Sequence, residues 1–135
     1  MVAINIEYRG DLHCKVAHGP SGTDFTTDAP KDSHGRGESF SPTDLVAAGL
    51  GSCILTVMGI MARSIKLDIS GATAIVDKEM VNAPVRKIQK LIVKIHVPQR
   101  LDDEQKRRLE DAACNCPVHR SMHPDVQVPI YFTWG

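Results

Sequence analysis

One uncharged stretch of sequence constrains the fold of this 135-residue chain more than any other feature. Residues 45–62, LVAAGLGSCILTVMGIMA, contain no charged side chain. The stretch reaches the lower length limit for a membrane span, but small and polar residues interrupt its first half and strand-like segments flank it. We therefore interpret it as a buried helix of a globular protein, with Ser41 as N-cap, Pro42 as its first residue and an end near Ser64.

This predicted helix is buried on most of its faces, because apolar residues occur all around it. Its first half is also rich in small residues, which allow another backbone segment to approach closely. These residues are Ala47, Ala48, Gly49, Gly51 and Ser52.

Alternating apolar and polar residues predict strands on both sides of the helix. The pattern predicts a half-buried strand over residues 2–8, and further strands over residues 12–17, 72–80, 87–97 and 126–134. Residues 18–42 are rich in Gly, Pro, Ser and Asp, which predicts a long loop with a short strand near Phe25. Pro129 indicates an edge position or a bulge in the last strand.

A second, amphipathic helix is predicted over residues 101–114. Asp102 is its expected N-cap, and Pro117 ends it. Helices are few and strands come in runs, so the sequence predicts an α+β fold with an antiparallel sheet. The length fits a single domain of residues 1–135.

Charge and composition narrow the functional classes. Lys and Arg number 16, equal to the 16 Asp and Glu, and this balance argues against binding to nucleic acid or to an anionic membrane. The opening sequence MVAINIEYRG lacks a signal-peptide pattern, and four cysteines are too few for a disulfide scaffold. We expect a cytoplasmic protein with reduced cysteines.

Two of the cysteines fall on apolar faces of the predicted helices. Cys53 lies in the first helix, and Cys116 continues the apolar stripe of the second helix that begins at Leu109. Cys114 points to another side of the same helix. The pattern indicates that Cys53 and Cys116 converge as a redox pair. The competing interpretation is that both are buried structural cysteines.

A second hypothesis concerns metal binding. Cys114, Cys116, His119 and His123 form the pattern C-x-C-x2-H-x3-H, whose ligand types suit zinc or copper. The spacing matches no standard zinc module, so we favour the absence of a metal.

A reactive Cys53 needs a nearby cation, because the thiolate is the nucleophile and burial disfavours its charge. Arg36, in the loop before the first helix, is the first candidate, and Arg9 is the second. Glu38 and Asp44 are the nearby carboxylates that we expect to hold the guanidinium.

Two motifs together resemble the OsmC/Ohr family, the osmotically inducible protein C and organic hydroperoxide resistance proteins. They are SPTDLVAAGLGSC before an apolar helix, and CPVHRSM before a terminal alternating strand. The resemblance covers roughly residues 35–135. It implies an α+β fold completed as an intertwined homodimer around two long central helices. It also implies a thiol-dependent peroxidase that reduces organic hydroperoxides without a metal, cofactor or prosthetic group.

The same resemblance implies roles for the two cysteines. Cys53 matches the peroxidatic cysteine, and Cys116, which directly precedes Pro117, matches the resolving cysteine. We therefore expect a Cys53 sulfenic acid, then a Cys53–Cys116 disulfide that an external dithiol reduces.

The resemblance also implies an active-site arginine held by a glutamate. Arg36 is the best match for the arginine, whereas Thr43 occupies the position of the glutamate. Glu38 and Asp44 are the candidates to replace that carboxylate. The departure at Thr43 favours an alternative, a non-enzymatic small-ligand or redox-sensing protein on the same fold.

Overall fold

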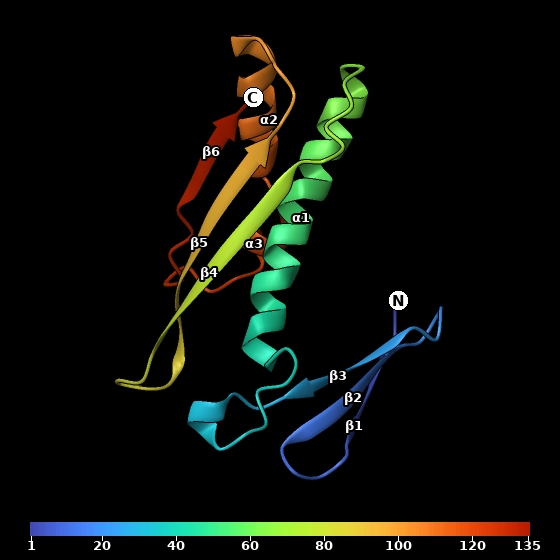
Figure 1. Ribbon diagram of the computed structural model, residues 1–135, viewed down its shortest axis with the longest axis vertical. Coiled ribbons are helices and arrows are strands. Elements are labelled where there is room, and N and C mark those ends of the chain that lie inside the picture. The colour runs from blue at the N-terminus through green and yellow to red at the C-terminus, as the bar shows by residue number, and fades with distance from the viewer. The chain divides into compact units, whose positions relative to one another are not determined.

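Two three-stranded sheets and one long helix make up most of the chain (Figure 1). The computed structural model describes all residues, 1–135, and the α+β class predicted from the sequence is confirmed. The contacts within the chain divide it into unit 1, Met1–Val46, and unit 2, Ala47–Gly135.

Unit 1 contains an antiparallel sheet in the order β1-β2-β3. Its strands are β1 (Ile4–Tyr8), β2 (His13–His18) and β3 (Asp24–Asp28), and a short 3-10 helix, η1 (Lys31–Ser33), follows. β3 confirms the short strand expected near Phe25.

The first strand is not half-buried as the sequence predicted. Every residue of β1 is exposed, and the apolar side of the strand is among the most exposed apolar surface in the chain, with Ile6 at 61%. Ile6 pairs with Val16, which pairs with Phe25, so one sheet face is apolar across all three strands. The alternation correctly predicted a strand with two different faces, but within this chain the apolar face stays open.

The long helix α1 (Pro42–Ser64) has the limits that the sequence predicted. Ser41 Oγ accepts a hydrogen bond from the Asp44 N–H at 3.1 Å, and the Asp44 carboxylate accepts one from the Ser41 N–H at 2.9 Å. This reciprocal arrangement satisfies two backbone donors at the helix start. At the other end, the Leu67 N–H reaches the Ala62 carbonyl at 2.8 Å across a left-handed Lys66, which closes the helix.

The burial of α1 differs from the prediction, because one face is buried rather than most of them. The buried residues recur every three or four positions and are Ala47, Leu50, Gly51, Ile54, Met58 and Ala62. Ile60, on the opposite face, is exposed. By length and composition α1 is also long and apolar enough to cross a membrane, a property it shares with core helices of soluble proteins.

Gly51 is the small residue of α1 at which the sheet approaches most closely. A Cβ at this position would lie 3.0 Å from Cγ2 of Val76 on β4, whereas a Cβ at Gly49 would meet no atom within 4 Å. The close approach predicted from the small residues therefore occurs at Gly51 within unit 2.

The sheet of unit 2 has the order β4-β5-β6. Its strands are β4 (Thr73–Val81), β5 (Lys87–Val97) and β6 (Ile130–Trp134). β4 and β5 are antiparallel as expected, but β5 and β6 are parallel, because the chain crosses over through helical structure between these two strands. β6 is an edge strand and begins directly after Pro129, in agreement with the position of that proline.

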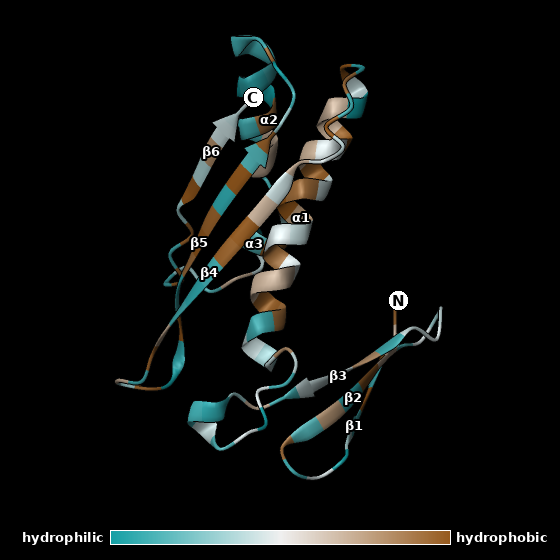
Figure 2. Cartoon of the chain, in the orientation of Figure 1, coloured by the Kyte–Doolittle hydropathy of each residue, from teal (hydrophilic) through white to brown (hydrophobic).

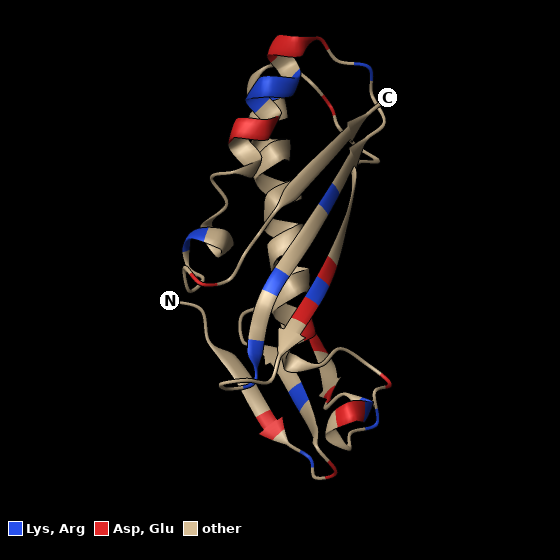
Figure 3. Ribbon diagram, turned by 90° about the vertical axis from the view of Figure 1, so that its left-hand side faces the viewer, with Lys and Arg blue, Asp and Glu red and all other residues tan.

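Two further helices lie between β5 and β6. They are α2 (Asp103–Ala113) and the short α3 (Pro117–Arg120). The sequence pattern predicted only the first of them. Asp102 caps α2, as predicted, and forms a capping box with Gln105. Acidic and basic residues gather on α2 and along the strands, whereas the long helix is largely free of them (Figure 3).

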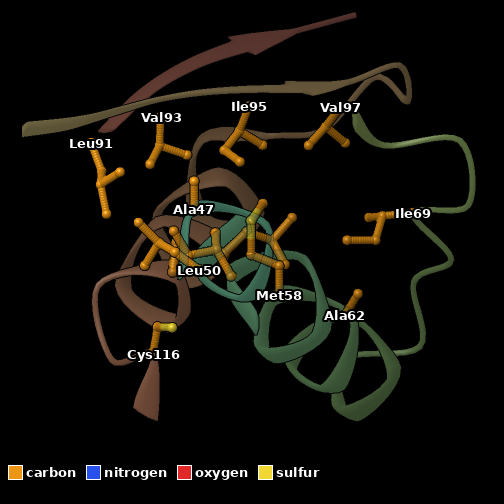
Figure 4. Close-up of a cluster of buried hydrophobic side chains, with 13 residues drawn as sticks. Ala47, Leu50, Met58, Ala62, Ile69, Leu91, Val93, Ile95, Val97 and Cys116 are labelled. Carbon is orange, nitrogen blue, oxygen red and sulfur yellow. The ribbon is translucent and has the colours of Figure 1, made fainter. Parts of the chain in front are cut away.

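The core of unit 2 forms where β5 covers the helices (Figure 4). Figure 2 shows the corresponding hydrophobic bands along α1 and β5. The side chains that β5 contributes to this core are Leu91, Val93, Ile95 and Val97, each at most 1% exposed. The helices contribute Leu50, Ile54 and Met58 of α1 together with Leu109 and Ala113 of α2.

We expect the Ile95→Ala substitution to destabilise the protein by about 2–5 kcal/mol, because it leaves a cavity under the sheet. Ile75→Ala is the matched control, since Ile75 lies on the neighbouring strand β4 and is 60% exposed. Its cost should stay below about 1 kcal/mol. Urea unfolding followed by circular dichroism measures both values, and equal costs would contradict the core assignment.

Candidate functional site

The structure brings Cys53 and Cys116 together. The Cys53 side chain lies close enough to Cys116 to raise the pKa of its thiol, although Cys53 belongs to α1 and Cys116 follows α2. Both cysteines are free thiols. Two facing thiols in one core can exchange between a dithiol and a disulfide without a large rearrangement.

Helix geometry places Cys53 at the border of the buried face of α1. Leu50 and Ile54 on that face are fully buried, and Cys53 lies to one side of them at about 100° per residue. Cys53 is half-buried, and it lies nearly in line along the helix with Ile60, seven residues further on, which is exposed. The thiol therefore contacts the core on one side and stays reachable on the other.

Cys116 has a different environment, because its side chain is fully buried. Helix α2 ends at Ala113, so Cys116 does not lie on α2 as the helical stripe implied. It adopts an extended backbone directly before Pro117, the first residue of α3. The extended turn between the two helices aims Cys116 at the core, while Cys114, the C-cap of α2, is exposed.

The surroundings of Cys116 raise the pKa of its thiol. Burial is the main cause, because a thiolate loses its hydration in the core, and the contact with Cys53 acts in the same direction. The backbone N–H groups of His119 and Val118 act in the opposite direction, although neither forms a helix-capping hydrogen bond. Cys116 is therefore held as a neutral thiol beside the more accessible Cys53.

The metal-site hypothesis for residues 114–123 receives no geometric support. Across residues 1–135, no three His, Cys, Asp or Glu side chains gather in a way that would hold a metal ion. Cys114 is exposed and Cys116 is buried, so the two sulfurs of the C-x-C pair face different environments.

Arg36 lies in unit 1, and its carboxylate partner is not one that the sequence indicated. The Arg36 Nε donates a hydrogen bond to Oδ2 of Asp11 at 2.8 Å. Asp11 raises the pKa of Arg36, and the charges of Asp28 and Glu38 add to this effect. The backbone N–H of Glu38 donates a hydrogen bond to Asp28 at 3.2 Å. The Glu38 side chain acts on Arg36 only through its charge.

The other sequence candidates have separate tasks. Asp44 caps the start of α1 rather than holding Arg36. Arg9, the alternative arginine, forms its ion pair with Glu7 on β1.

Sequence reasoning missed a buried His–Asp pair in unit 1. The Asp28 side chain is only 2% exposed, and its Oδ1 lies 2.5 Å from Nδ1 of His13. The hydrogen bond with His13 is the main cause that lowers the pKa of Asp28. No local sequence pattern predicts this pair, because His13 and Asp28 become neighbours only through the pairing of β2 with β3.

Comparison with known proteins supports one family. Residues 35–130 match the family described as OsmC-like protein. A candidate osmotic stress induced and detoxification response protein from Psychrobacter arcticus 273-4 is 41% identical in sequence. Its structure has a TM-score of 0.93 and covers 98% of this chain and 96% of its own. No curated protein matches the chain significantly.

Two more distant structures share the fold. An OsmC-like protein from Mycoplasma pneumoniae has a TM-score of 0.83 at 16% identity, covering 99% of this chain and 96% of its own. An organic hydroperoxide resistance protein OsmC from Legionella pneumophila has a TM-score of 0.78 at 16% identity, covering 98% and 96%.

We expect alkylating reagents to distinguish Cys116 from Cys114 in the native protein. Cys116 is fully buried with a raised pKa, whereas Cys114, two residues away, is exposed. Site-resolved mass spectrometry after iodoacetamide treatment at neutral pH should find Cys114 labelled and Cys116 protected until the protein unfolds. Equal labelling rates in the folded protein would contradict the burial of Cys116.

Proposed function

Because the chain belongs to the OsmC-like protein family, we propose that it is a cysteine-based peroxidase that reduces organic hydroperoxides. The observation that carries this proposal is the contact between the half-buried Cys53 thiol and the fully buried Cys116 thiol. At the level of the family, a peroxide-related role agrees with relatives that include organic hydroperoxide resistance proteins.

The first chemical step takes place at Cys53, the more accessible of the two thiols. Its thiolate attacks the outer oxygen of the hydroperoxide, and the O–O bond breaks as the S–O bond forms. Sulfur is oxidised to a sulfenic acid, and the peroxide is reduced to an alkoxide that takes a proton to become an alcohol. The open side of Cys53 gives the substrate access to the sulfur.

The second step uses Cys116 as the resolving thiol. The Cys116 sulfur attacks the Cys53 sulfenic acid, water leaves, and a disulfide joins the two residues. The existing contact between the side chains makes this step local. An external dithiol then reduces the disulfide and is itself oxidised, which restores both thiols.

Arg36 supplies the positive charge that this chemistry requires. A guanidinium favours the Cys53 thiolate over the thiol and stabilises the departing alkoxide. Glu38 contributes only the attraction of its charge to Arg36. Arg36 belongs to unit 1 and Cys53 to unit 2, and we infer that residues 1–135 act as one functional domain. The match over residues 35–130 supports this, because it crosses the limit between the units.

The protein acts as an intertwined homodimer in the cytoplasm, without a nucleic-acid or membrane partner. Two exposed apolar surfaces support self-association, namely the β1 face that includes Ile6 and the outer face of α1 at Ile60. A reducing compartment supports a cycle that must return to two thiols. The neutral net charge supports the absence of a polyanionic partner.

The cysteine roles predict different outcomes for three substitutions. With cumene hydroperoxide and dithiothreitol, Cys53→Ser should abolish peroxide consumption, because the attacking sulfur is gone. Cys116→Ser should form a Cys53 sulfenic acid, detectable with dimedone, without forming the Cys53–Cys116 disulfide. Cys114→Ser is the control and should retain wild-type turnover, because Cys114 is exposed outside the pair.

These outcomes also separate the peroxidase from a redox sensor. An unreactive Cys53 at stoichiometric peroxide would overturn the proposed function. Oxidation of the pair without dithiol-supported turnover would instead indicate redox sensing.

The proposed homodimer can be tested by introducing one carboxylate on either face of β1 and measuring the mass of the protein in solution. We expect wild-type protein to have about twice the 14.8 kDa chain mass in sedimentation equilibrium. Ile6→Glu should weaken association, because it places a carboxylate on the apolar face of β1. Asn5→Glu is the matched control on the other face of the same strand. A monomeric wild-type protein, or equal effects of the two substitutions, would contradict an interface on this face.

A further inference from the structure

The face of the unit 2 sheet that points away from the helices carries a hollow of its own. Side chains alternate along a strand, so the residues of β5 between the buried Val93, Ile95 and Val97 point to this outer face. The hollow has a volume of about 460 Å³, which is within the size range of small-molecule sites. The side chains that line it come from all three strands and are Thr73, Ile75, Lys94, His96, Tyr131 and Thr133.

One row of residues across the sheet has a lysine between two apolar walls. Lys94 of β5 pairs with Ile75 of β4 on one side and with Tyr131 of β6 on the other. Ile75 and Tyr131 are 60% and 61% exposed, so both side chains stand clear of the sheet. Neighbouring strands are about 4.8 Å apart, which places these two residues roughly 10 Å from each other. This spacing leaves room for one flat ring between the two walls.

The Lys94 ammonium can bind an anion although it already has a partner. Its Nζ lies 3.1 Å from Oδ2 of Asp77, and both side chains are more than half exposed. A lysine carries three N–H donors and Asp77 takes one, so two remain for a ligand. Asp77 lies on the side of Lys94 away from His96. The exposed pair contributes little to stability, but it limits the positions that the ammonium can adopt.

The next row contains a histidine whose tautomer is set by its neighbour. Nδ1 of His96 lies 2.7 Å from Oγ1 of Thr133, and this hydroxyl is directed at the Ile95 carbonyl at 3.5 Å. A hydroxyl has a single proton, so Thr133 donates to Ile95 and accepts a hydrogen bond from the Nδ1–H of His96. The neutral ring then has its lone pair on Nε2, which forms no hydrogen bond with another residue. Nε2 is therefore an acceptor for a ligand.

We propose that this hollow binds a small aromatic carboxylate that carries a hydroxyl or amino group at the opposite end of its ring. The carboxylate pairs with Lys94, and the ring lies between Ile75 and Tyr131. The O–H or N–H of the ligand donates to Nε2 of His96. Lys94 and His96 are two residues apart, which is about 7 Å along a strand and suits a ring with polar groups at opposite ends.

This site goes beyond the peroxidase function and does not depend on it. Cys53 belongs to α1, which packs against the other face of the sheet (Figure 4). The residues of the hollow are also different from those of the two apolar surfaces that support self-association. The thiol pair and the ligand site can therefore be tested separately.

The test is an NMR titration of isotope-labelled, full-length protein with 4-hydroxybenzoate. We expect shifts in the amides of β4, β5 and β6 and a Kd of about 1 mM or tighter. Lys94→Met should weaken binding about tenfold or more, because the carboxylate loses its charged partner, whereas Lys94→Arg should retain most of the affinity. Lys90→Met is the matched control and should leave the Kd unchanged, since Lys90 lies on the same face of β5 but pairs with Glu79 outside the hollow.

Two further comparisons locate the ring and the hydroxyl of the ligand. Tyr131→Ala should weaken binding several-fold, whereas Tyr131→Phe keeps the wall and should retain the affinity. Benzoate, which lacks the hydroxyl, should bind the wild-type protein more weakly than 4-hydroxybenzoate does. His96→Ala should remove this difference between the two ligands, because the acceptor of the hydroxyl is gone.

Each other outcome overturns the inference. The absence of shifts at several millimolar 4-hydroxybenzoate, or shifts centred on Cys53, would show that the ligand does not occupy the hollow. Equal effects of Lys94→Met and Lys90→Met would show that binding reflects only the general charge of the sheet. If the ligand binds as expected but peroxide fails to oxidise Cys53, the peroxidase proposal fails while the site on the outer face stands.

Discussion

The packing of one apolar face of α1 against β5 is the interaction on which the rest of unit 2 depends. This contact buries Leu50, Ile54 and Met58 beneath the inward side chains of β5. It fixes the rotation of α1 about its own axis, and that rotation leaves Cys53 at the border of the core. The same core receives the turn after α2 that carries Cys116. The thiol pair is therefore a consequence of how hydrophobic surface is buried.

The elements that sequence patterns predicted well are those with strong local signals. The limits of α1 follow from the Ser41 cap and from an uncharged run, and β5 follows from strict alternation. The parallel pairing of β5 with β6 is a property of connection rather than of pattern. Burial of β1 was overestimated because alternation reports two different faces and does not say what covers the apolar one.

The candidate site was also predictable only in part: the burial of Cys116 was predicted, whereas the partners of the charged residues were not. The helical stripe correctly predicted that Cys116 is buried, although the residue lies beyond the end of α2 and is aimed by a turn. The partners of charged residues were not predictable, because Asp11 and Arg36 are far apart in sequence and meet through the turn between β1 and β2. Short-range proximity favoured Glu38 and Asp44. Asp44 caps α1 instead, and Glu38 acts on Arg36 only through its charge. Tertiary pairing of exposed charges leaves no trace in residue spacing.

The one-sided burial of α1 has a consequence for how the protein responds to its own concentration. Cys53 stands between a packed surface and an unpacked one that includes Ile60. A partner that binds the exposed face of α1 would also limit which molecules can reach the Cys53 sulfur. The reactivity of Cys53 would then depend on protein concentration, because association covers the thiol and dilution uncovers it. The same protein would react differently in a concentrated and in a dilute solution.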